Sequence, residues 1–379
     1  MKRFLGICLL LPSLCLAAPN LTSPEGMTAT CAALPVQPNA LKTNAERQAF
    51  VVCHDLALLK QMVTWFMEGI KTYGGKGNNP EKLNSVLHQE FGYVRDQLRI
   101  SRDVLLRLKL KSGEGLLLTP AAWQMDWDSN GKLDAWERYL FAIPKRNNQA
   151  FEVNLPRNQE TYYQQHFDLQ ANFRVDHGDV LWALAYHQFA EGLMEILLAH
   201  RLNLGDPKTG WLELVDSAAM RRAHQRIGEG FASSAAMRRA LLAETDDTLE
   251  WIPNPRQQHS VFPLALDAQA FEIWGQVMAE LQPLWAGKTL LAVDARAGGL
   301  VGQAAKLCPA GQGLNLATFF QHPNRYPFRP EGWQAACQNV DAQHPVSGLA
   351  ALMNQATERG RANPNSPAWQ FVRYLYWVN

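Results

Sequence analysis

Two long stretches between residues 44 and 111 carry apolar side chains at intervals of three and four residues. This spacing belongs to one face of an α-helix, so it predicts two long helices. The first would be capped by Asn44 and end at Gly74–Gly75, and the second would run from Pro80 to about Lys111. The glycine-rich segment between them is typical of a turn, so we expect an antiparallel helical hairpin.

The rest of the chain predicts further helices and little β-structure. Residues 176–203 are the most apolar helical stretch and would lie near the centre of the core. Two runs alternate with period two, Phe151–Leu155 and Phe167–Val175, which predicts at most a small β-hairpin. Further helices are expected at 216–228, 232–243, 267–285, 346–359 and 367–378. The predicted fold class is mainly α, a multi-helix globular body.

The first seventeen residues have the composition of a secretory signal. Lys2 and Arg3 precede an apolar run, and small side chains favour cleavage after Ala17. The run is shorter than the roughly 20 apolar residues of a membrane span, so we expect no transmembrane span after signal removal. A lipid anchor on Cys15 is disfavoured because Leu14 is bulky. The chain would then comprise residues 1–17 as signal and helical regions at 18–145 and 146–379, which could form one continuous body. The expected location is periplasmic or secreted.

Cysteine usage agrees with export. Two of the six cysteines lie in the predicted signal, which leaves Cys31, Cys53, Cys308 and Cys337. An even number of cysteines in an oxidising compartment favours disulfides, and four cysteines allow three connectivities. The pairs Cys31–Cys53 and Cys308–Cys337 are favoured because each closes a short loop, although sequence alone leaves the other pairings open.

The charge balance argues against a nucleic-acid partner. The formal net charge is +1, and it becomes −1 when Lys2 and Arg3 leave with the signal. A near-neutral chain lacks the basic surface that such binding needs. Aromatic residues near the C-terminus, in RYPFRPEGW and WQFVRYLYWV, could stack on a glycan of the cell envelope, or could be core residues. A cell-envelope component is therefore one candidate partner, with no nucleic acid.

The segment DWDSNGKLDAWE, residues 126–137, has side chains spaced for wrapping one cation. Calcium takes six to eight oxygen ligands, and a twelve-residue loop supplies them from alternating positions. Glycine at the sixth position permits a sharp turn, and Leu133 at the eighth would pack inward. Glu137 at the twelfth would give both carboxylate oxygens. The candidate metal ligands are Asp126, Asp128, Asn130, Lys132 (through its backbone carbonyl), Asp134 and Glu137.

This segment resembles an EF-hand, and it matches that family at every ligand position. The resemblance covers about Leu118 to Pro144 and implies a helix, a calcium loop and a second helix that Pro144 stops. Hands of this family usually occur in pairs, yet ETDDTLEW at 244–251 has acids without the central glycine and the spacing. A single hand has no partner loop to open against. We therefore expect a structural Ca²⁺ that is coupled to local folding.

Catalytic candidates are confined to one helix face. His187, Glu191 and Glu195 lie four residues apart on the predicted helix at 176–203, so they share a face. They could serve a metal or general acid chemistry, or they could be buried groups paired with arginines. The predicted function is thus an exported calcium-binding protein. The alternative is a periplasmic hydrolase or glycan-processing enzyme with a scaffold calcium, for which a pocket should open Glu191 or Glu195 to solvent beside His187.

Overall fold

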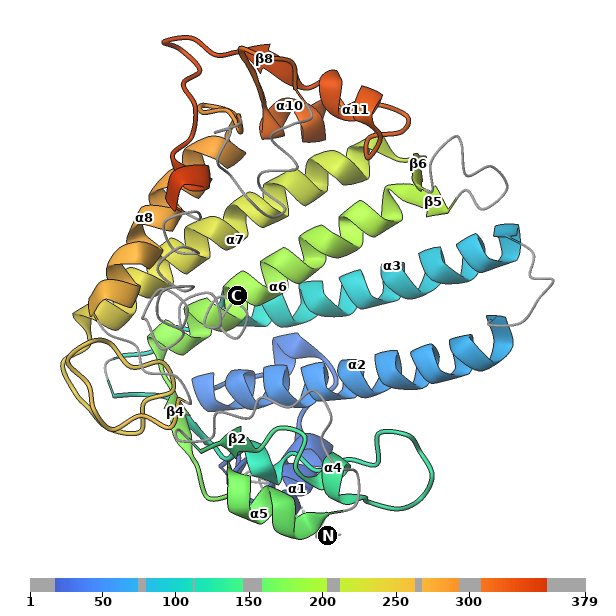
Figure 1. Cartoon of the computed structure of the whole chain (residues 1–379). Helices are drawn as coiled ribbons and strands as arrows, with labels where there is room; N and C mark the ends of the chain where they lie inside the picture. Colours follow the sequence, from blue (N-terminus) through green and yellow to red (C-terminus); the bar gives the residue numbers. More distant parts are fainter. Residues whose placement is uncertain are drawn as a thin grey trace, which may run out of the picture.

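The computed structural model describes residues 18–73, 80–111, 113–145, 159–202, 212–262, 268–292 and 308–352. Long helices that lie side by side dominate the fold (Figure 1), namely α2 (Asn44–Tyr73), α3 (Pro80–Leu105), α6 (His177–Leu198), α7 (Ser217–Ala243) and α8 (Ala268–Trp285). α6 packs between α3 and α7, and α8 packs on α7. The mainly α fold class is confirmed.

Shorter helices complete the described chain: α1 (Pro24–Ala33), η1 (Pro38–Ala40), η2 (Pro120–Ala122), α4 (Ala135–Arg138), α5 (Glu160–His166), α10 (Leu316–Gln321) and α11 (Pro330–Gln334). α10 packs against α7 at the end of the molecule where α11 also lies (Figure 1). The two helices predicted at 216–228 and 232–243 are one helix, α7. Gly228 and Gly230 lie within it, and because they have no side chains, Trp285 and Phe189 can approach its backbone closely.

Polar caps set the starts of the helices. The N-terminus of α2 is a capping box, in which the Thr43 hydroxyl accepts from the Glu46 amide and the Glu46 carboxylate accepts from the Thr43 amide. The predicted cap, Asn44, is instead the first helical residue, so that boundary was wrong by one position. Asp176 caps α6 and accepts a hydrogen bond from the Asp179 amide.

The strands form four short antiparallel pairs within the described residues. They are β1 (Leu116–Leu118) with β4 (Phe173–Val175), β2 (Ile143–Pro144) with β3 (Phe167–Asp168), β5 (His200–Leu202) with β6 (Leu212–Leu214), and β7 (Gln312–Leu314) with β8 (Cys337–Asn339). The alternating run Phe167–Val175 therefore divides between two pairs, because its partners come from the segment after α3. The other alternating run, Phe151–Leu155, lies outside the described residues.

One large hydrophobic cluster joins both halves of the chain. It includes Leu21 near the start of the described chain and Leu349 near its end, together with the fully buried indoles of Trp127 and Trp274. Burial of such large side chains is the main favourable term in folding. The cluster crosses residue 146, where the sequence suggested a boundary between two helical regions.

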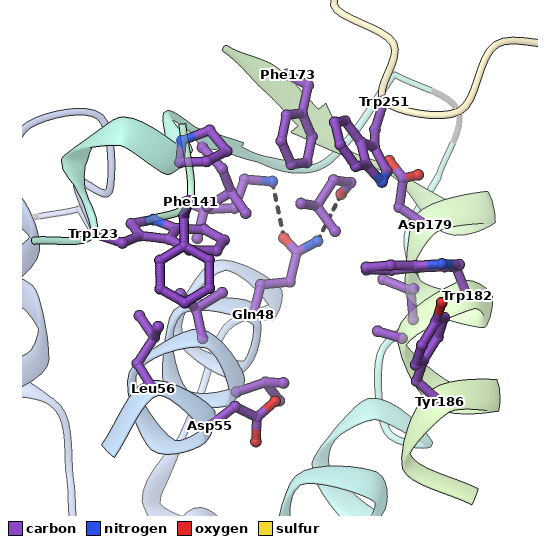
Figure 2. A pocket seen from close by; sticks show the side chains of 18 of the residues that line it. Gln48, Asp55, Leu56, Trp123, Phe141, Phe173, Asp179, Trp182, Tyr186 and Trp251 are labelled. Atoms are coloured by element: carbon purple, nitrogen blue, oxygen red, sulfur yellow. Dashed lines mark hydrogen bonds between the residues drawn. The ribbon is translucent and has the colours of Figure 1, made fainter. Parts of the chain in front are cut away.

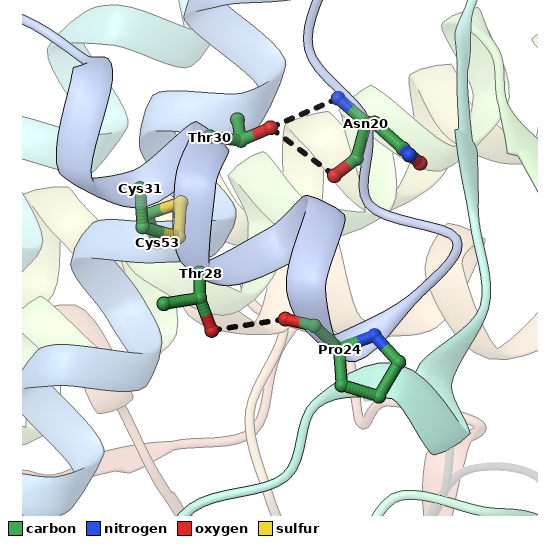
Figure 3. Close-up of a disulfide and its surroundings, with 6 residues drawn as sticks. All are labelled: Asn20, Pro24, Thr28, Thr30, Cys31 and Cys53. Carbon is green, nitrogen blue, oxygen red and sulfur yellow. Dashed lines mark hydrogen bonds between the residues drawn. A yellow bond between two sulfur atoms is a disulfide. The ribbon is translucent and has the colours of Figure 1, made fainter.

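Both favoured disulfides are confirmed. Cys31 of α1 is joined to Cys53 of α2 with 5.5 Å between their Cα atoms, and Cys308 is joined to Cys337 of β8 with 5.7 Å. Figure 3 shows the first bridge, with the Thr30 hydroxyl beside it donating to the Asn20 carbonyl and accepting from the Asn20 amide. The bridge joins α1 to α2, and these hydrogen bonds join Asn20 to α1. Two disulfides are typical of an oxidising, exported environment.

Several predictions for the chain ends lie outside the described residues: the signal at 1–17, the lipid anchor on Cys15 and the helix at 367–378. One helix within the described ranges, residues Asn44–Gly69 of α2, is long and apolar enough by composition to cross a membrane, which by itself is weak evidence of a span. The core helix of a soluble protein passes the same test, although such a helix is mostly buried and this segment is not.

Candidate metal centre

The acidic loop folds around glycine and serine residues in left-handed backbone conformations. Gly131 has φ +80° and Ser129 has φ +56°, which turn the chain sharply after Asp128. The flanking helices are shorter than predicted. The segment before the loop holds only the 3-10 turn η2, and the exit helix α4 is a single turn that ends at Arg138 rather than at Pro144, because Ile143 and Pro144 pair with β3 instead.

Three of the predicted ligands converge. One carboxylate oxygen each of Asp126, Asp128 and Glu137 lies within 4.8 Å of the other two. Asp126 is held by the Asn130 amide at 3.0 Å and the Gly131 amide at 2.9 Å, one on each of its oxygens. Each carboxylate oxygen has a second lone pair, so these backbone bonds leave acceptor capacity for a cation.

Glu137 is the most constrained of these groups. Glu137 is 0% exposed, and its carboxylate accepts hydrogen bonds from three backbone amides. Oε1 accepts from Trp127 at 2.7 Å and Asp128 at 3.2 Å, and Oε2 accepts from Asp134 at 2.9 Å. These bonds join the second and third residues of the loop to its last turn. They hold a buried carboxylate among neutral donors, which is a costly place for a charge without a cation.

The other predicted ligands have local roles in the loop. The Asn130 side-chain oxygen accepts from the Lys132 amide at 2.8 Å, and the Asp134 amide is held by Glu137. Asp134 is also the N-cap position of α4. Asp134 is not among the three carboxylates that share the 4.8 Å cluster.

The loop is packed into the main core through aromatic side chains. Trp127, at the second loop position, is 1% exposed and contacts Phe141 at a ring-centroid distance of 5.8 Å. Phe141 also contacts Trp123 at 5.4 Å, just before the loop. The position of the loop is therefore coupled to the positions of the Trp123 and Phe141 rings.

The three catalytic candidates do not form one reactive centre. His187 Nε2 lies 2.9 Å from Asp55 Oδ2 of α2, whereas Glu191 is bound by Arg102 at 2.6 Å and Arg226 at 3.0 Å. Glu195 is bound by Arg222 at 2.9 Å. Both glutamates are buried, so α6 uses this face for ion pairs with α3 and α7.

Electrostatics agree with a paired role for His187. Burial by itself would raise the pKa of Asp55, but the charge of His187 and hydrogen bonds from His187, His54 and Ser101 lower it to about 2. Burial lowers the pKa of His187, yet the Asp55 charge outweighs this and leaves the pKa raised. The two groups therefore form an ion pair at mildly acidic pH.

A serine adjoins this pair but is not placed as a nucleophile. The Ser101 hydroxyl donates to Asp55 at 2.6 Å and lies 3.0 Å from His54 Nδ1. Ser101 is 0% exposed, so a substrate has no access to its oxygen. We interpret the group as a polar bridge between α2, α3 and α6.

A second carboxylate cluster was not predicted. Asp176 at the start of α6 lies with Glu244 and Glu250, and one oxygen of each is within 4.8 Å of the others. Burial, reinforced by the charge of Asp176, raises the pKa of Glu244 to about 9 and that of Glu250 to about 7. Asp179 beside them is 3% exposed, and burial raises its pKa well above the ordinary value.

Two of the three carboxylates of this cluster lie close together in the sequence. Glu244 and Glu250 both belong to ETDDTLEW, which fails as a calcium loop because it lacks the glycine turn. Asp176 is distant from them in sequence, and its role as the N-cap of α6 accounts for an aspartate at that position. Its approach to Glu244 depends on the packing of α6 against α7, which periodicity does not specify.

No family model, no curated protein and no solved structure matches this chain.

Proposed function

We propose that this protein is an exported calcium-binding protein that holds one structural Ca²⁺ in the loop Asp126–Glu137. The observation that carries the proposal is the meeting of Asp126, Asp128 and Glu137 within 4.8 Å, with Glu137 fully buried. Hard oxygen ligands at this density suit Ca²⁺ better than softer metals. Without a cation, the three carboxylates repel one another in a partly water-excluded site.

The role of the ion would be to stabilise the fold. The cluster joins residues at both ends of the loop, and Trp127 between them is inserted into the main core. A bound ion would thus fix the backbone that positions Trp123, Trp127 and Phe141. An affinity near 10⁻⁴–10⁻³ M, as in many extracellular modules, is sufficient in a calcium-rich exterior. The two disulfides support such a location.

The arginine pairing of Glu191 and Glu195 favours this function over a hydrolase that uses those acids. A general acid must reach the proton that it transfers. Arg102, Arg226 and Arg222 occupy the carboxylates instead.

Terbium luminescence tests the site. Tb³⁺ takes the same oxygen ligands as Ca²⁺, and Trp127 lies within the loop, so excitation of tryptophan should sensitise the bound ion. We expect saturable emission that excess Ca²⁺ displaces and that Glu137→Gln removes. Glu160→Gln is the matched control, because Glu160 binds Arg138 and Tyr139 beside the loop without belonging to the cluster. Equal emission from wild type and Glu137→Gln would refute the assignment.

A further inference from the structure

A large apolar cavity adjoins the calcium loop. Its volume is about 840 Å³, within the 300–1,000 Å³ range of ligand-binding pockets. Figure 2 shows aromatic rings on several sides, with Trp123 and Phe141 facing Trp182 and Tyr186 of α6, and with Phe173 and Trp251 closing a third side. Aliphatic side chains of α2, α3 and the β1–β4 ribbon fill the gaps between the rings.

The lining holds few polar groups, and its strongest ones are already engaged, although the indole N–H groups of Trp123 and Trp251 and one oxygen of Asp179 are buried without a partner among the described residues. Gln48 donates to the Val175 carbonyl at 2.7 Å and accepts from the Leu116 amide at 2.9 Å, so both ends of its amide are used to join β4 and β1 (Figure 2). Asp55 and His187 neutralise each other. Asp179 lies beside Trp251 at the edge of the cavity, and burial raises the pKa of its carboxyl well above the ordinary value.

This lining selects against polar ligands. A phosphate or charged amine that entered the cavity would lose its hydration among mostly apolar side chains, and the few unpartnered indole N–H groups would not replace that hydration, which is unfavourable. An apolar chain would gain contacts with the rings and aliphatic groups and would lose only contacts with water. The cavity is therefore suited to a hydrocarbon.

The surface of α2 continues the cavity outward. Val52, Asp55, Leu56 and Leu59 line the cavity, and the same helix face carries Met62 and Phe66 one and two turns further on. Leu59, Met62 and Phe66 are exposed by 36%, 36% and 59%. An elongated apolar row thus leads from solvent to the cavity, which fits a long chain better than a compact ring.

From these observations we propose that the cavity between α2, α6 and the aromatic residues before and after the calcium loop binds a long unbranched acyl chain. The chain would enter along Phe66, Met62 and Leu59 of α2, and its polar end would remain in solvent at that mouth. The chain could belong to a free fatty acid or to a membrane lipid, since both present the same hydrocarbon. This proposal goes beyond calcium binding and does not depend on it.

Fluorescence of cis-parinaric acid, an eighteen-carbon fatty acid that accepts energy from tryptophan, tests the proposal directly. We expect saturable binding to the full chain, roughly in the micromolar range. Unlabelled palmitate should displace the probe if the cavity takes free fatty acids, and lysophosphatidylglycerol should displace it if the cavity takes a lipid chain. Displacement by neither compound, or a failure of the probe to saturate, would overturn the proposal.

Two variants that fill the cavity from opposite walls locate the bound chain. Val52→Trp on α2 and Ala183→Trp on α6 each place an indole into the cavity. Each should weaken probe binding by about fivefold or more, because a filled cavity has no room for the chain. Ala232→Trp on α7 is the matched control, since Ala232 is exposed and does not belong to the lining.

Near-ultraviolet circular dichroism of each variant confirms folding before binding is measured, and one folded variant of the two is sufficient. If neither filled variant folds, Leu59→Lys at the exposed mouth replaces them and should give the same loss, because a charge would lie on the path of the chain. A loss smaller than about fivefold in a folded variant, or an equal loss in Ala232→Trp, would contradict the proposal.

Discussion

The molecule contains two clusters of three carboxylates that differ in how they are built. In the loop cluster, Asp126, Asp128 and Glu137 come from one stretch of twelve residues, and backbone amides of the same stretch hold their oxygens. In the second cluster, Asp176 comes from the start of α6, while Glu244 and Glu250 follow α7. The two clusters contain similar ligand atoms at similar separations.

The surroundings of the two carboxylate clusters differ. Loop amides donate to carboxylate oxygens of the first cluster, and each of these oxygens keeps a second lone pair for a cation. In the second cluster, burial and mutual repulsion raise the pKa of Glu244 to about 9, so protons neutralise the group. Proximity of acids is therefore insufficient to identify a cation site, because a cluster of buried acids can also be neutralised by protons.

The largest expected effect is that of Glu137→Gln. Saturating Ca²⁺ at 100 times its dissociation constant stabilises a site by about 2.7 kcal/mol, which corresponds to a melting-temperature rise of roughly 3–6 °C. The variant should lose this calcium-dependent rise because it lacks the bidentate carboxylate. Differential scanning calorimetry with Ca²⁺ and with chelator measures it. A rise that persists in Glu137→Gln would place the stabilising ion elsewhere.

Gly131→Ala should give the next largest effect. A Cβ at this position meets no atom within 4 Å, so the cost comes from the left-handed backbone at φ +80° and amounts to about 1–2 kcal/mol. If the turn must form to bind calcium, terbium affinity should fall by about 5- to 30-fold. Gly113→Ala is the matched control, with φ +75° and an equally open site away from the loop. It should destabilise the fold without changing terbium affinity, and equal losses of affinity would contradict the coupling.

The second cluster predicts a smaller, pH-dependent effect. Glu244 and Glu250 ionise near pH 4.5 when unfolded, but at about 9 and about 7 in the folded chain. The folded state therefore binds more protons in this window, and stability falls as pH rises through it. Glu244→Gln should flatten this decline and raise the melting temperature at pH 8 by about 2 °C, with little change at pH 4.5.

Thermal melts from pH 4.5 to 9 check this dependence, with Glu272→Gln on the exposed face of α8 as the control. If the melting temperatures of wild type and Glu244→Gln fell in parallel as pH rises, Glu244 would not be the group that is protonated in the folded state.

The smallest expected effect separates the two clusters. Glu250→Gln should leave the terbium titration of the loop within about twofold of wild type, because the second cluster holds protons rather than the ion. Luminescence titration at pH 7 measures this. Loss of terbium emission in Glu250→Gln together with normal emission in Glu137→Gln would reverse the comparison.

Local sequence predicted the loop and the long helices well, because their determinants are close in the chain. The spacing of Asp126, Asp128 and Glu137 encodes their convergence, and apolar periodicity encodes α2, α3 and α6. Chain order also favoured the correct disulfides, since each closes a short loop.

Features that depend on packing between distant segments were not predictable in the same way. The Asp55–His187 pair spans α2 and α6, and the cavity draws its walls from residues between Gln48 and Trp251. The loop lacks long flanking helices because Ile143–Pro144 finds a strand partner in β3, a long-range choice that the run AWERYLFAIP does not reveal. Helical spacing correctly placed Glu191 and Glu195 on one face but did not show which arginines would bind them.

Equilibrium dialysis against radioactive calcium tests the central claim most directly. We predict about one ion bound per chain for the wild type and for Glu244→Gln, and none for Glu137→Gln at the same free calcium, since the Glu137 carboxylate joins the two ends of the loop. Binding that is unchanged in Glu137→Gln, or that is lost in Glu244→Gln instead, would contradict the assignment of the calcium site to Asp126–Glu137.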